Sequence, residues 1–184
     1  MTEFRFETAR LILRDWRDDD WPVFWQATNT AAVMRWLGGV ADDATRAAAQ
    51  ARLESYRADY GHTFWVVERK DDGALLGFCG LKRSNQAGGP QGMMEAGWRL
   101  REDAWGQGYA REAAAASLTL AFERFGADEV IALTVQGNTG SWGLMLRLGM
   151  ARREDLDFDS PDFDPENPRI IAYAIARSVW LPAA

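Results

Sequence analysis

The sequence has few of the features on which several classes of protein depend. It contains one cysteine, Cys79, so no internal disulfide can form. It contains one histidine, His62, and no set of His, Cys or carboxylate residues has the spacing of metal ligands. No apolar run approaches the ~20 residues of a membrane-spanning helix, and the N-terminus shows no signal-peptide pattern. We therefore expect a soluble, cytoplasmic protein with no metal and no membrane partner.

Positive charge is also scarce. The 21 lysines and arginines face 27 acidic residues, which gives a net charge of −6. Nonspecific binding of nucleic acid needs a basic face, so no nucleic-acid partner is predicted. The segment 154–166 contains seven acidic residues and no basic one. It is interpreted either as a solvated loop or as a negative rim that attracts a cationic acceptor.

The chain length and the residue patterns indicate one mixed α/β domain covering residues 1–184. We expect a central, twisted, mostly antiparallel sheet of about six to seven strands, flanked by about four helices. The strands on either side of helix 109–125 should be parallel, because a helical crossover joins them. Strands are predicted near 10–14, 63–68, 74–82, 94–100, 129–135, 150–153 and 170–176, and helices near 21–38, 43–60, 109–125 and 138–148.

A glycine-rich turn precedes the alanine-rich helix. Gly106, Gly108 and Ala110 are small enough to let backbone N–H groups approach a ligand. The first turn of a helix has unpaired N–H groups and a partial positive charge, which together bind phosphate. The pattern also fits a simple tight turn. No Gly-Lys-Ser/Thr ending is present, which excludes a P-loop, and neither the spacing nor the strand position fits a Rossmann fingerprint.

Three segments, taken in order, resemble the GNAT superfamily of N-acetyltransferases. Glu95-Ala-Gly-Trp-Arg-Leu100 resembles the fourth strand of that family. Trp105-Gly-Gln-Gly-Tyr-Ala110 resembles its Q/R-x-x-G-x-G/A loop, and Asn138-Thr-Gly-Ser141 with Leu148-Gly149-Met150 resembles its N-x-x-S…L-G-F stretch. Trp105 stands where many members have Gln or Arg. In this respect the loop is similar to the branch of ribosomal-protein N-terminal acetyltransferases.

The resemblance implies acetyl-coenzyme A as co-substrate. The fourth and fifth strands are then expected to splay apart and to hold the pantetheine arm between them. The turn at 106–110 would bind the pyrophosphate, and Asn138 would bond the pantetheine arm, cap its helix, or do both. The cofactor-binding residues implied are Leu100, Trp105, Gly106, Gln107, Gly108, Tyr109, Ala110 and Asn138.

The resemblance also implies direct transfer of the acetyl group to a primary amine, with a backbone N–H of the fourth strand stabilising the oxyanion. Glu95 is the candidate base, acting directly or through water; the alternative is a structural ion pair with Arg99 on the same strand face. Many members use a tyrosine as acid where this chain has Met145. Ser141 is the candidate replacement, and water or a purely capping role for Ser141 are the alternatives.

The function implied is an N-acetyltransferase acting on a protein or peptide N-terminal α-amine or on a small amine. An α-amine has a lower pKa than lysine and needs less help to lose its proton. The alternatives are an antibiotic or polyamine acetyltransferase and a non-catalytic coenzyme A-binding sensor. Trp16, Trp25 and Trp36 are candidates for lining the acceptor site. The nine tryptophans and the habit of the family make a homodimer plausible.

Overall fold

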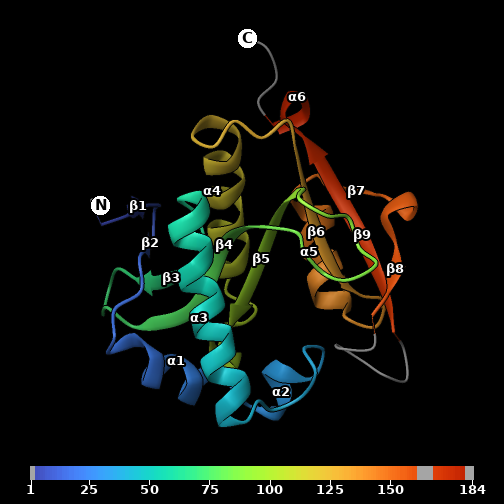
Figure 1. The fold of residues 1–184 in the computed structure, drawn as a ribbon. Helices are drawn as coiled ribbons and strands as arrows, with labels where there is room; N and C mark the ends of the chain where they lie inside the picture. The colour runs from blue at the N-terminus through green and yellow to red at the C-terminus, as the bar shows by residue number, and fades with distance from the viewer. Residues whose placement is uncertain (1–2, 161–167, 181–184) are drawn as a thin grey trace.

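The structure, a computed structural model, describes residues 3–160 and 168–180 (Figure 1). Within these residues no helix has the length and apolar content needed to span a membrane. The helices and strands are, in chain order, β1 (Arg5–Glu7), β2 (Leu11–Arg14), α1 (Asp20–Thr28), α2 (Ala31–Met34), α3 (Asp43–Tyr60), β3 (Phe64–Arg69), β4 (Leu75–Arg83), β5 (Met94–Leu100), a 3-10 turn (Glu102–Ala104), α4 (Tyr109–Glu123), β6 (Glu129–Val135), α5 (Thr139–Arg147), β7 (Ala151–Arg152), a second 3-10 turn (Glu154–Leu156), β8 (Phe158–Asp159), β9 (Arg169–Ala176) and α6 (Arg177–Trp180).

All the strands described belong to one nine-stranded sheet with the order β1-β2-β3-β4-β5-β6-β9-β7, and β8 pairs with β9. Among these described strands only β5 and β6 are parallel, because α4 crosses between them; the other pairs are antiparallel. The predicted mixed, mostly antiparallel fold is confirmed. The predicted strand near 150–153 is present as β7. The structure adds β1 and β8, whose three and two residues are too few to show an alternating pattern.

The first predicted helix is interrupted. Helix α1 ends at Thr28, and Asn29 then binds the backbone of Ala41 in both directions, through Nδ2 to the carbonyl and through Oδ1 from the N–H. Thr30 caps a new helix, α2, by accepting from the N–H of Val33. The side-chain bonds of Asn29 and Thr30 therefore replace helical bonds and let α2 begin separately from α1.

A buried ion-pair cluster fixes α1 to the sheet. Arg14 of β2 is 5% exposed and bonds Asp20 at 2.7 and 2.8 Å and Glu68 of β3 at 2.6 Å. Asp19, at the N-cap position of α1, makes no side-chain cap bond. Asp20 instead binds Arg14, and Arg14 in turn binds Glu68, so the cluster joins α1 to both β2 and β3.

Helices cover the two faces of the sheet differently. Figure 1 shows α4 behind the sheet and α3 in front of it. Buried side chains of α4, such as Ala113 and Leu118, pack with Met94, Ala96 and Leu100 of β5. On the other face α1 and α3 form a second cluster with β3 and β4, made of Trp21, Phe24, Trp25, Leu53, Tyr56, Val66 and Leu75. Glu95, Gly97 and Arg99 alternate along β5 with the residues of the α4 face, so the side chains of Glu95 and Arg99 belong to this second face.

Candidate active site

Strands β5 and β6 are paired only at one end. Met94 opposes Val130 and Glu95 opposes Ile131, after which both strands continue without further ladder partners between them. Figure 1 shows the two strands diverging from that end. The predicted splay of the two strands is therefore confirmed.

The diverging edge of β5 presents unpaired backbone groups. The N–H of Arg101 donates to the carbonyl of Leu76 on β4 at 2.8 Å. Every second residue before Arg101, which includes Arg99 and Gly97, therefore turns its backbone groups toward β4. Backbone groups alternate in direction along a strand, and those of Ala96, Trp98 and Leu100 therefore face β6. This edge can accept another extended chain as a strand-like partner.

Trp105 is engaged with this edge rather than with the loop. Its indole Nε1 donates to the carbonyl oxygen of Leu100 at 2.9 Å, and Trp105 as a whole residue is 49% exposed. Leu100 has two backbone groups that face β6, its carbonyl and its N–H. Since the carbonyl accepts from Trp105, the N–H is the one left for a ligand. Trp105 ties the end of β5 to the glycine loop, which is a positioning role.

The glycine loop has the geometry of an anion site. Gly106 and Gly108 have φ angles of 72° and 82°, in the left-handed region that favours glycine. Gly108 is the N-cap of α4 and supplies no side-chain cap. Within the described part of the chain, the N–H groups of residues 106–111 donate no hydrogen bond. A run of free N–H groups at a helix start is suited to binding a phosphate.

The side chains around the loop act on its shape. Nε2 of Gln107 donates to the carbonyl of Asp103 at 2.7 Å, so that amide nitrogen is already occupied. Arg10 donates from Nη1 to the carbonyl of Gln107 at 3.0 Å and from Nε to Glu112 at 2.7 Å. The guanidinium of Arg10 also lies 4.5 Å from the centre of the Tyr109 ring, which is buried. Tyr109 and Ala110 offer backbone N–H groups, and Arg10, whose charge is paired with Glu112, holds the loop in place beside them.

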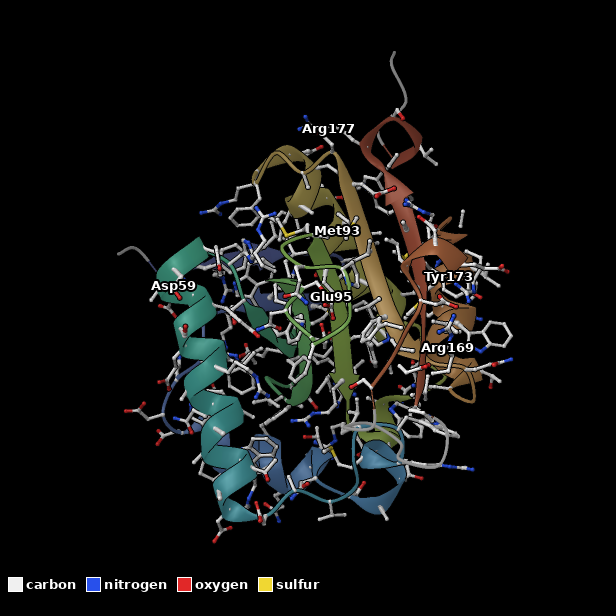
Figure 2. All side chains as sticks on the ribbon, turned by 45° about the vertical axis from the view of Figure 1, so that its right-hand side comes forward. Asp59, Met93, Glu95, Arg169, Tyr173 and Arg177 are labelled. Atoms are coloured by element: carbon white, nitrogen blue, oxygen red, sulfur yellow. The ribbon has the colours of Figure 1, made fainter. Side chains whose placement is uncertain are left out.

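Glu95 is buried on the face opposite α4. It is 6% exposed, and Figure 2 shows it on β5 near the centre of the sheet. Nζ of Lys82 lies 3.2 Å from its Oε2, but that oxygen accepts no hydrogen bond from any residue that the structure describes. Burial raises the pKa of Glu95, opposed by the positive charge of Lys82. The structural alternative of an ion pair with Arg99 is wrong, because Lys82 is the cation beside Glu95.

A polar chain continues from this carboxylate. Lys82 donates to Oδ1 of Asn85 at 3.1 Å, and Nδ2 of Asn85 donates to the hydroxyl of Tyr56 at 3.1 Å. Sequence reasoning missed Lys82. The signal is the hairpin register, which places Lys82 directly opposite Glu95.

Asn138 and Ser141 lie at the start of α5. Oδ1 of Asn138 accepts from the N–H of Ser141 at 3.3 Å, so Asn138 caps the helix as one of its two expected roles. Within the described residues, Nδ2 of Asn138 and Oγ of Ser141 have no hydrogen-bond partner. Met145 is 1% exposed in the core shared with α4, so its position holds no proton donor. Helix α5 therefore lies on the α4 face of the sheet, opposite Glu95. A ligand that passes between the parted strands could contact both Glu95 and Ser141.

Helix α2 and the residues after it bridge the parted strands. Sδ of Met34 accepts from Nη1 of Arg99 on β5 at 3.1 Å. The Trp36 ring lies against Gly137, where a Cβ atom would come within 2.8 Å of it. Trp36 thus reaches the end of β6, and Trp25 packs against Arg99 with a ring distance of 4.9 Å. Trp16 instead stacks on Trp21 in the second-face cluster.

The acidic segment is largely neutralised where the structure describes it. Asp155 pairs with Arg153, Asp157 with Arg152, and Asp159 with Arg169. Residues 161–167, including the rest of the acidic run, lie outside the described residues. The described carboxylates therefore give little support to a negative rim.

The single cysteine and the single histidine of the sequence both pack in the core. Cys79 is fully buried beside Ser117, and burial raises the pKa of its thiol to about 12. His62 is also buried, with Nδ1 3.1 Å from the carbonyl oxygen of Leu81. Among the described residues no group of three or more His, Cys, Asp or Glu side chains is placed to hold a metal ion.

The fold and the site define a class of enzyme. A sheet that parts between two parallel strands, beside a free helix start, is the architecture of an acetyl-coenzyme A-dependent acyltransferase. Residues 10–151 match the family described as "Acetyltransferase (GNAT) domain", and the chain belongs to this family.

Relatives support this membership. The "Uncharacterized protein YkkB" of Bacillus subtilis is 31% identical over 144 residues, covering 78% of this chain and 83% of the relative. The "Uncharacterized N-acetyltransferase YnaD" of the same organism is 28% identical over 146 residues, covering 79% and 81%. A solved GNAT-family acetyltransferase from Bacillus anthracis has a TM-score of 0.77 at 22% identity, covering 95% of this chain and 99% of that one, which shows a shared fold.

Proposed function

We propose that this enzyme transfers the acetyl group of acetyl-coenzyme A directly to a primary α-amine, on a peptide N-terminus or on a small molecule. The observation that carries the proposal is the unpaired edge of β5 next to the free N–H groups of residues 106–111. The segment Trp105–Ala110 supports a relation to the ribosomal-protein-like branch within the family.

The residues present fit acetyl-coenzyme A. The loop at 106–111 supplies N–H donors for a pyrophosphate, and a Cβ at Gly106 would meet nothing within 4 Å, so the loop is open on that side. The N–H of Leu100 and the Nδ2 of Asn138 are available to the pantetheine arm. When bound, the cofactor supplies the activated acetyl thioester.

The backbone of β5 and Glu95 would carry the chemistry. The N–H of Trp98 faces the parted strands and would stabilise the negative charge that develops on the acetyl oxygen. Glu95, directly or through water, would take the proton of the incoming ammonium. The amine nitrogen would then bond the acetyl carbon and the carbon–sulfur bond would break. The second proton that the nitrogen must lose would pass to the departing thiolate, relayed by Ser141 or by water. The raised pKa of Glu95 brings this base closer to neutral pH, where proton transfer is most effective.

Two measurements test the proposal. Calorimetry should detect binding of acetyl-coenzyme A, and a thiol-release assay over a panel of amines and N-terminal peptides should detect turnover. Tight coenzyme binding without turnover on any acceptor would contradict catalysis and would favour a coenzyme A-binding sensor. Faster turnover of polyamines or aminoglycosides than of α-amines would contradict the acceptor class.

A further inference from the structure

Arg99 is a charged side chain in the site for which the described residues supply no acidic partner. It lies two residues beyond Gly97 on the same face as Glu95. Its Nη1 donates to Sδ of Met34, and its buried Nε has no hydrogen-bond partner among the residues that the structure describes. No carboxylate of those residues lies within ion-pairing distance of it. Within the part of the chain that the structure describes, the charge of Arg99 is therefore uncompensated.

Aromatic rings hold this guanidinium in place. Its central carbon lies 4.4 Å from the centre of the Phe24 ring, 4.9 Å from that of Trp25 and 5.1 Å from that of Phe78. Such contacts stabilise a cation without neutralising it. Burial lowers the pKa of Arg99 to about 9, which leaves the guanidinium charged at neutral pH. Since a buried charge without a counter-ion is costly, an anionic ligand here would gain free energy.

Among the described residues, the other charged side chain on this face of β5 is paired, and so are three carboxylates of the acidic segment. Lys82 compensates Glu95, and the acidic side chains Asp155, Asp157 and Asp159 are paired with arginines. Among the residues that the structure describes, Arg99 is therefore the charge on this face of β5 that is left without an ion pair. A purely cationic acceptor would be repelled by it.

Arg99 is next to the point of reaction. The backbone N–H of its neighbour Trp98 faces the parted strands, and Met34 of α2 fixes one nitrogen of the guanidinium. An amine at Trp98 would therefore have its neighbouring atoms close to Arg99. Arginine binds a carboxylate through two parallel N–H bonds, which gives orientation as well as affinity.

We propose that the acceptor carries a carboxylate a few bonds from its primary amine and that Arg99 binds this carboxylate. A free amino acid fits better than a peptide N-terminus, in which an amide replaces the α-carboxylate. This inference rests on the proposed acetyl transfer and narrows its acceptor.

A matched set of acceptors tests the proposal: L-phenylalanine, L-phenylalaninamide and phenethylamine, with the same three forms of methionine. For the wild-type enzyme, kcat/KM for each amino acid should exceed that for its amide by at least about tenfold, a size expected for a buried charge pair. The ratio of kcat/KM for the amino acid to kcat/KM for its amide should fall to about one in Arg99→Met. Arg99→Lys should keep part of this preference. Arg83→Met, a change on the neighbouring strand, should leave the preference unchanged.

The structural alternative makes different predictions. If Arg99 only packs, Arg99→Met should lower activity equally on acid and amide, and this would overturn the inference. A wild-type enzyme that prefers the amide or the decarboxylated amine would overturn it as well, with acetyl transfer left standing. A wild-type enzyme that acetylates none of these amines would instead contradict the proposed function. The affinity for acetyl-coenzyme A should be the same in wild type and Arg99→Met, which shows that the variant is folded.

Discussion

At the scale of single residues, burial determines the chemistry of Glu95. The carboxylate lies within the sheet, and its pKa is raised by burial while Lys82 opposes the rise. A carboxylate in such a setting holds its proton to higher pH than an exposed one. The same residue in a solvent-exposed strand would be a weaker base at neutral pH.

Replacing Glu95 by Gln should lower turnover at least about tenfold while the affinity for acetyl-coenzyme A is retained. Because the pKa of Glu95 is raised, the acidic limb of the wild-type pH–rate profile should lie above the ordinary glutamate value, and Glu95→Gln should lack this limb. Steady-state kinetics across pH and calorimetry measure both. Glu129→Gln, on β6 and paired with Arg153, is the control expected to keep the wild-type profile. An unchanged rate in Glu95→Gln would remove this side chain from the mechanism.

At the scale of elements, the start of α4 depends on one backbone conformation. Gly108 has a left-handed φ of 82°, which lets the chain enter the helix with its first N–H groups free. A Cβ atom there would meet only Nη2 of Arg10, at 3.3 Å, and that end of the side chain can move. Asparagine and aspartate are the other residues that adopt this conformation with least strain.

This gives a matched pair of variants, Gly108→Asn and Gly108→Asp, which have the same size and backbone preference. The aspartate places a negative charge where the pyrophosphate is expected to bind. The dissociation constant of acetyl-coenzyme A should therefore be about tenfold or more higher for Gly108→Asp than for Gly108→Asn. Calorimetry at low and high salt measures the difference, which should shrink as salt screens the charge. Equal affinities would mean that the helix start does not hold the phosphates.

At the scale of the whole molecule, one buried histidine links stability to pH. His62 is 1% exposed and its Nε2 has no partner in the described residues, so burial lowers its pKa. The unfolded chain then binds a proton more readily than the folded one below about pH 6.5. Stability from this group is complete above that pH and is lost as the pH falls. Glu95 acts in the opposite direction, because its raised pKa makes the folded state bind the proton first.

A comparison with His62→Asn isolates this effect, since asparagine does not titrate and can still donate to the carbonyl of Leu81. Between pH 7.5 and 5.5, the wild type should lose up to about 1.4 kcal/mol of unfolding free energy relative to the variant. Urea unfolding at both pH values measures the difference. The NMR titration of the single histidine should give a pKa below 6.5 in the folded protein. An equal change of unfolding free energy with pH in wild type and His62→Asn would contradict the link between His62 and acid stability.

The sequence alone was sufficient for features that depend on neighbours in the chain. Apolar periodicity located β3 to β6 and the long helices, and the crossover through α4 fixed the parallel pair. Gly106 and Gly108 indicated the turn, and Asn138 indicated the helix cap. These features are local because hydrogen bonds and backbone angles between close neighbours decide them.

Only the tertiary structure decided which distant side chains meet. Arg10 lies beside the loop at Gln107, Lys82 compensates Glu95, and Met34 holds Arg99. Each contact joins elements that no local pattern connects, because the register of strands and the packing of helices set it. The sequence by itself determined the family and the scaffold, while the charges that the acceptor meets depend on burial and pairing in the folded molecule.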